Sequence, residues 1–178
     1  MIWRVTFVSL LIGVIGYGDL RAQTQTIGIN FAADEPDGAG RADVDVFKGE
    51  PAGILDTFLW NNVEGATGSA ADLLDAEGNQ TTAAVSWTSN NTWSSAERGE
   101  ENNNAVLDSN DYRLMLGYLD TTDTSVTEVE VSGLQFPGPY DVNVYIMGGV
   151  NGRGGTYQIG DQSVNHVNSA AFDGVYLS

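Results

Sequence analysis

Acidic side chains gather early in the chain in a pattern that suits calcium binding. Asp34, Asp37, Asp43 and Asp45 fall within one short stretch. Calcium takes about six to eight oxygen ligands, and a loop between two early strands can supply them from carboxylates and backbone carbonyls. The spacing does not match an EF-hand, because Gly38 follows Asp37 directly and no glutamate closes the loop. These four aspartates are candidate ligands of a structural calcium ion, with a solvated acidic loop as the alternative.

A second group of residues combines an indole ring with amide and carboxylate side chains. Trp93 follows Asn90 and Asn91, and Glu101 lies in the polar segment 97–104, which we expect to be a surface loop. A sugar ring stacks its apolar face on an aromatic ring while its hydroxyls bind amides and carboxylates. We therefore predict that Trp93 forms a ligand platform in a polar loop, with hydrogen bonds from the other three residues. The alternative is a tryptophan that fills the core.

The glycine-rich segment 151–155 (NGRGG) is a third candidate for ligand contact. Its glycines allow positive φ or close backbone approach, and Arg153 is one of few basic residues. A phosphate-binding loop would require a following helix, whereas a strand is expected here. Asn151 and Arg153 are candidate ligand contacts, and the alternative is a hairpin loop in which Arg153 pairs with a surface carboxylate.

The titratable residues provide little evidence for catalysis. His166 is the only histidine, which excludes a multi-histidine metal centre, and we expect it in a strand or turn. No nucleophile elbow or zinc-protease helix motif occurs. Two carboxylates among Glu100, Glu101, Asp108 and Asp111 could serve a glycosidase. We predict that the protein is not an enzyme and keep a small glycoside-active enzyme as an alternative.

The first 22 residues have the pattern of a secretory signal peptide. Arg4 precedes an uncharged apolar run over 5–17, and Ala22 is a small residue after which a signal peptidase can cut. A transmembrane anchor needs about 20 apolar residues, and Asp19 and Arg21 interrupt the run before that length. We predict export to the cell surface or medium, with the periplasm as an alternative, and no membrane insertion after cleavage.

Composition limits the partners of the expected mature chain, residues 23–178. The full chain has a formal net charge of −17, which repels phosphate backbones and anionic lipid and argues against nucleic acid and membrane surfaces as partners. A hydrophobic content of 42% favours a folded chain over a disordered one. The absence of cysteine excludes disulfides and thiolate-bound zinc. Nothing in the composition determines the oligomeric state.

Strand patterns dominate the chain after residue 26. Segments with apolar alternation, bounded by glycine, proline or asparagine, predict the strands 27–31, 44–47, 57–63, 72–75, 81–88, 124–132 and 140–146. Gly160 and Asp161 predict a two-residue hairpin between 157–159 and 162–164. Trp87 lies two residues after Val85, so in a strand both side chains point to the same face, and Trp87 is expected in the core. The stretch 113–119 fits either a strand or a helical turn, and 75–79 fits a turn. Short strands without a long helical period favour a single all-β sandwich domain.

Several of these segments together resemble secreted bacterial surface proteins. They are 27–33 (IGINFAA), 60–63 (WNNV), 86–93 (SWTSNNTW), 98–102 (RGEEN) and 148–157 (GGVNGRGGTY). Such domains resemble the galactose-binding-like jelly roll of carbohydrate-binding modules, and the resemblance covers about residues 27 to 178. It implies a jelly-roll β-sandwich and a non-catalytic module that binds carbohydrate or cell-surface polymer, often with structural calcium. The segment 172–178 looks like a turn running into an unfinished strand, so we expect the jelly roll to lack its last strands. A structural or adhesion domain of a larger extracellular protein is the alternative function.

Overall fold

The chain folds as an all-β protein. The computed structural model describes residues 10–13, 25–32, 45–94, 103–135, 139–147, 151–168 and 171–176. Within these ranges the strands β1 to β11 are accompanied by one short helix, α1. None of the helical residues described forms a segment long and apolar enough to cross a membrane. The predicted all-β class is confirmed, and the strands form several small, mostly antiparallel sheets.

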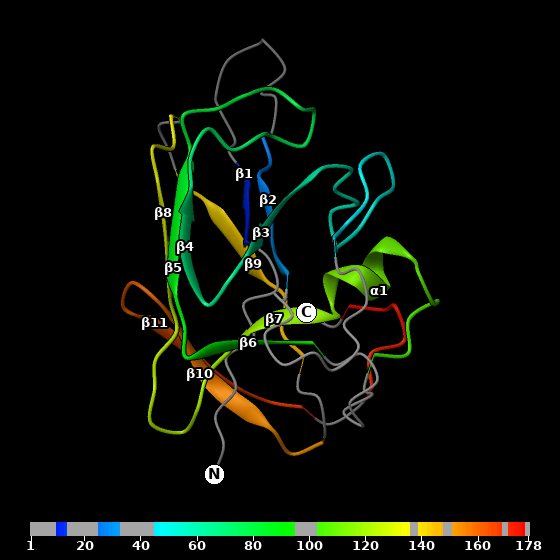
Figure 1. Cartoon of the computed structure of the whole chain (residues 1–178), viewed down its shortest axis with the longest axis vertical. Helices are drawn as coiled ribbons and strands as arrows, with labels where there is room; N and C mark the ends of the chain where they lie inside the picture. The colour runs from blue at the N-terminus through cyan, green and yellow to red at the C-terminus, as the bar shows by residue number, and fades with distance from the viewer. Residues whose placement is uncertain are drawn as a thin grey trace.

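A three-stranded antiparallel sheet forms one layer of the molecule (Figure 1). Its order is β4 (Thr67–Ala70), β5 (Ala84–Thr88) and β8 (Glu128–Ser132). Along β5 the side chains of Val85 and Trp87 are buried while their neighbours face outward, as the alternation predicts. β5 starts later than predicted, because the Thr81 and Thr82 hydroxyls instead bond to the carbonyls of Leu73 and Gly133.

The second layer contains a parallel pair, β2 (Gly28–Ala32) and β3 (Trp60–Glu64). Every residue of β2 is buried, and Ile29 and Phe31 pack with Val63 against Val85 and Trp87 of the first layer. The Phe31 and Trp87 rings meet edge to face, with centroids 5.6 Å apart. This contact between layers gives the protein its sandwich-like character.

Two predicted strands are wrong, and side chains of β3 explain why. At 44–47 and 72–75 the structure has no strand in the residues it describes. The Asn62 amide instead accepts from Val46 N at 3.0 Å and donates to Val46 O at 3.1 Å. The Asn61 amide bonds Leu74 N and Leu74 O in the same way, at 2.9 Å each. Each asparagine therefore replaces the backbone of a neighbouring strand, which gives the WNNV segment a structural role.

The ambiguous stretch 113–119 contains both kinds of element. The helix α1 (Asn110–Leu114) is capped by Ser109, whose Oγ accepts from Tyr112 N at 3.1 Å. After Leu116 the chain extends as β7 (Gly117–Asp120), which pairs antiparallel with β6 (Asn91–Ser94). A second apolar cluster lies beside these elements, with Trp60, Leu114, Met115, Tyr118, Tyr145 and Met147 among its buried members.

The predicted hairpin is confirmed. β10 (Gly154–Ile159) pairs with β11 (Gln162–Val167), and Ile159 faces Gln162 across the turn. Gly160 has φ of +59°, the left-handed conformation that glycine adopts readily. His166 lies on β11, in agreement with its expected strand position.

One strand comes from the predicted signal peptide. β1 (Leu10–Gly13) pairs antiparallel with β9 (Asp141–Val144), so that Leu10 lies opposite Val144. In Figure 1 the two strands run side by side near the centre of the molecule. Cleavage after Ala22 would therefore remove the β1 partner of β9.

Export should yield a protein that starts at or near Gln23. The charged start, the short apolar run and the small residue at position 22 all favour cleavage there. Intact-mass measurement of the exported protein checks this, and recovery of Met1 on that protein would show that β1 is retained.

Candidate functional site

A cavity of about 340 Å³ lies beside β9 and the end of β11, and we call it the aromatic cavity. Its walls include Tyr145, Phe172 and Tyr176, together with the polar side chains of Asn143, His166 and Asn168. No aspartate, glutamate, lysine or arginine is among the described residues that line it. An uncharged cavity in a chain with a net charge of −17 suits a neutral ligand.

Ring contacts hold the aromatic wall together. Tyr176 packs edge to face on Tyr145 with centroids 5.1 Å apart, and Phe172 lies 4.9 Å from Tyr176. Tyr145 in turn meets Trp60 edge to face at 5.9 Å. Such pairs fix ring orientation, so the segment 171–176 is anchored to the core.

Hydrogen bonds fix the two tyrosine hydroxyls as well. Tyr145 Oη accepts from Ile54 N at 2.9 Å, while Tyr176 Oη donates to Asp111 Oδ1 at 2.7 Å. Burial raises the pKa of Tyr145 and of Tyr176, and the Asp111 carboxylate raises both further. Both phenols stay neutral at physiological pH, so they form rigid walls rather than acid–base groups.

The glycine-rich loop lies next to this cavity. Gly152 N donates to Asn168 O at 2.8 Å, Asn168 N donates to Arg153 O at 2.7 Å, and the Asn168 amide reaches Asn151 Oδ1 at 3.4 Å. Asn168 lines the aromatic cavity. The predicted contacts Asn151 and Arg153 therefore belong to a hairpin end that touches the cavity wall.

Trp93 lies elsewhere than predicted. It belongs to the strand β6 rather than to a polar loop, is half-buried, and packs against the cluster that contains Tyr118 and Tyr145. Asn90 is exposed just before this strand, and Asn91 is its half-buried first residue. The cause is pairing with β7, which places Trp93 opposite Tyr118 and draws the ring toward the apolar cluster.

Most of the predicted calcium ligands lie outside the described residues. These are Asp34, Asp37 and Asp43, and the proposed hydrogen-bonding residue Glu101 is outside them too. Asp45 is described and half-buried, immediately before Val46. The described ranges contain no group of three acidic, histidine or cysteine residues that could hold a metal ion. Calcium binding at the aspartates stays a prediction.

Of the carboxylates considered for catalysis, the structure describes Asp108 and Asp111, and both make structural contacts. Asp111 Oδ1 accepts from both Gly53 N and Tyr176 Oη, and Asp108 lies 3.5 Å from the Arg113 guanidinium. The imidazole Nε2 of His166 is buried and has no hydrogen-bond partner within the described ranges.

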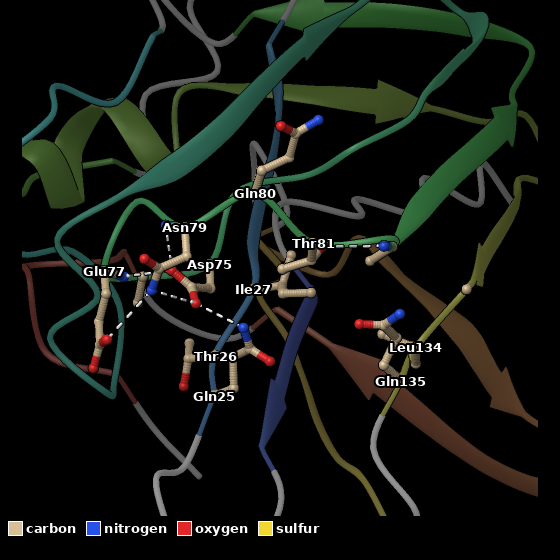
Figure 2. A pocket seen from close by; sticks show the side chains of 13 residues that line it. Gln25, Thr26, Ile27, Asp75, Glu77, Asn79, Gln80, Thr81, Leu134 and Gln135 are labelled. Carbon is tan, nitrogen blue, oxygen red and sulfur yellow. Dashed lines mark hydrogen bonds between the residues drawn. The ribbon is translucent and has the colours of Figure 1, made fainter.

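A second cavity, of about 360 Å³, surrounds a buried carboxylate (Figure 2). We call it the Asp75 cavity, and its lining includes Gln25, Glu77, Asn79 and Gln135. Asp75 Oδ1 accepts from the backbone of Glu77 and Asn79, at 3.0 and 2.8 Å. Oδ2 accepts from the side chains of Gln25 and Asn79, at 2.6 and 3.1 Å. These bonds confirm the turn predicted at 75–79.

Four donors use the acceptor capacity of the Asp75 carboxylate. Burial by itself would raise the pKa of Asp75, but the hydrogen bonds from Gln25, Asn79 and Glu77 outweigh it and lower the pKa. The ionised carboxylate therefore holds the turn and clamps Gln25, which joins two segments 50 residues apart in sequence. The sequence predicts only a turn here, because no local pattern indicates the bond from Gln25.

Comparison of the chain with protein-family models, with curated proteins and with solved structures gave no match. The function is therefore inferred from the geometry of the aromatic cavity.

Proposed function

We propose that this protein is a secreted, non-catalytic module that binds neutral carbohydrate or a hydroxyl-rich cell-surface polymer in the aromatic cavity. The composition of the cavity lining supports this function. Aromatic rings lie beside amide and imidazole side chains, and the described lining residues include no aspartate, glutamate, lysine or arginine. We further propose that the sandwich is of the galactose-binding-like jelly-roll type, with structural calcium at Asp34, Asp37, Asp43 and Asp45.

The chemistry of sugars supports this choice of cavity. The C–H face of a pyranose packs on rings such as Phe172 and Tyr176, while the side chains of Asn143 and Asn168 can both donate to and accept from hydroxyls. The Asp75 cavity suits such a ligand less, since its lining contains no aromatic ring and its central carboxylate already accepts four hydrogen bonds.

The overall charge supports a neutral ligand over an anionic one. A net charge of −17 disfavours phosphate-bearing and sulfated polymers at long range. Hydroxyl-rich neutral chains experience no such repulsion and bind through short-range contacts.

Blocking the cavity with a bulky side chain tests the proposal. Val175 lines the aromatic cavity and is 64% exposed, so Val175→Trp should fill the entrance without disturbing the core. We expect the affinity for a neutral oligosaccharide, found by calorimetric screening of gluco-, galacto-, manno- and xylo-oligosaccharides, to fall at least about tenfold. Asn168→Ala should weaken it by roughly 1–3 kcal/mol through loss of a hydrogen-bonding group.

Val164→Trp is the matched control. Val164 is also 64% exposed but does not line the cavity, so its replacement should leave affinity unchanged. Equal affinity of Val175→Trp and the wild type would place the sugar elsewhere. New reducing ends released during the titration would indicate a glycosidase instead of a binding module.

A further inference from the structure

Two neighbouring loops, 47–58 and 103–109, expose six large apolar side chains to solvent. Exposed fractions run from 42% for Phe47 to 77% for Val106. We call this set the apolar patch; it consists of Phe47, Ile54, Leu55, Phe58, Val106 and Leu107. Single exposed apolar residues are ordinary, whereas groups of them mark interaction surfaces.

Hydrogen bonds tie the two loops together. The Asn110 side chain accepts from Phe47 N and donates to the carbonyls of Phe47 and Glu50, each at 2.8 Å. The Arg113 guanidinium lies 3.9 Å from the centre of the Phe47 ring and pairs with Asp108 in the second loop. Figure 1 shows the 47–58 loop in cyan and the segment around α1 in yellow-green on the same side of the molecule.

The loop that carries most of the patch is held in one conformation. Ala52 and Thr57 exchange backbone hydrogen bonds of 3.1 and 2.9 Å, and Gly49 N donates to Phe58 O at 2.9 Å. Gly53 N is anchored to Asp111 at 2.9 Å. A preorganised apolar surface loses little conformational entropy when a partner binds, which favours docking.

Acidic residues surround the patch. Glu50, Asp56 and Asp108 lie in the same two loops and are exposed, and Lys48 is the one exposed base among the residues of these loops that the structure describes. Asp173 adds a further exposed carboxylate, since its segment lies beside the second loop through the bond from Asn104 N to Phe172 O. The exposed carboxylates outnumber the bases Lys48 and Arg113 around the patch, so its border carries a net negative charge.

We propose that the apolar patch is a docking surface for a partner protein whose own apolar surface is bordered by basic residues. Charge complementarity selects this occupant. A second copy of the chain would bring the same acidic border and the same net charge of −17 into contact. An anionic membrane is repelled for the same reason.

A pair of synthetic peptides tests the proposal. An amphipathic helical peptide of leucine and lysine presents the required surface, and the same peptide with glutamate in place of lysine reverses its charge. Fluorescence anisotropy at physiological salt should show binding of the lysine peptide alone. The double variant L55S/F58S keeps every charge, and we expect it to weaken that binding at least about tenfold. The double variant E50Q/D108N should weaken it and reduce its salt dependence.

Matched controls separate the patch from general charge attraction. V126S and I159S remove exposed apolar side chains of similar kind elsewhere, at 75% and 51% exposure, and should bind the lysine peptide like the wild type. Unchanged binding by L55S/F58S would overturn the proposal. A dimer of the wild type in light scattering that L55S/F58S abolishes would also overturn it. Binding of the wild type to phosphatidylcholine vesicles that L55S/F58S abolishes would do the same. Oligosaccharide affinity should not change in L55S/F58S, so failure of either proposal leaves the other intact.

Discussion

Replacing Trp87 with alanine should lower the free energy of unfolding by about 3–5 kcal/mol, the largest effect we expect from a single side chain. Trp87 is 5% exposed and fills the space between the two layers, where its ring meets Phe31. Its Nε1 also donates to Gly65 O at 2.7 Å. Alanine would leave both a cavity and an unpaired carbonyl.

Urea unfolding followed by circular dichroism measures this effect. Trp87→Phe keeps most of the ring volume and loses the hydrogen bond, so a cost of roughly 1–2 kcal/mol is expected. Trp93→Ala should also destabilise the fold, though less than Trp87→Ala, because Trp93 is half-buried against the second cluster. A Trp93→Ala protein as stable as the wild type would contradict that packing role.

Replacing Asp75 with asparagine should cost about 2–3 kcal/mol at neutral pH, because an amide nitrogen would face donors that now bond to a carboxylate. The effect depends on pH with a definite sign. Since the pKa of Asp75 is lowered from its ordinary value of 3.8 by folding, the carboxylate stabilises the folded state above that value. This stabilisation is lost as the pH falls through the folded-state pKa.

Unfolding free energies of wild type and Asp75→Asn, measured from neutral to acidic pH, check the prediction. The difference should be constant above about pH 5 and shrink below about pH 4. Asp72→Asn is the matched control: Asp72 is exposed with φ of +54°, a conformation that asparagine tolerates, so we expect a change within about 0.5 kcal/mol. A difference that persists unchanged at acidic pH would show that Asp75 does not act through its charge.

Local sequence patterns are enough to predict the class of fold and those elements whose residues follow a strand or turn pattern. Val85 and Trp87 alternate with polar neighbours, so their burial follows from the two-residue period of a strand. Gly160 and Asp161 define their hairpin because a two-residue turn needs positive φ at its first position, which Gly160 supplies. The Asp75 turn follows likewise from aspartate, glycine and asparagine at turn spacing.

Tertiary structure alone decided where contacts between distant segments form. The amides of Asn61 and Asn62 replace strand pairing for Leu74 and Val46, and no local pattern distinguishes such amides from surface asparagines. Trp93 became part of a packed strand because β7 pairs with it, although its neighbours in sequence are polar. The aromatic cavity combines residues from 54 to 176, so it exists only once the chain has folded. The physical reason is the same in each case: local periodicity reports which face of an element is apolar, whereas burial and hydrogen bonding depend on which other element meets that face.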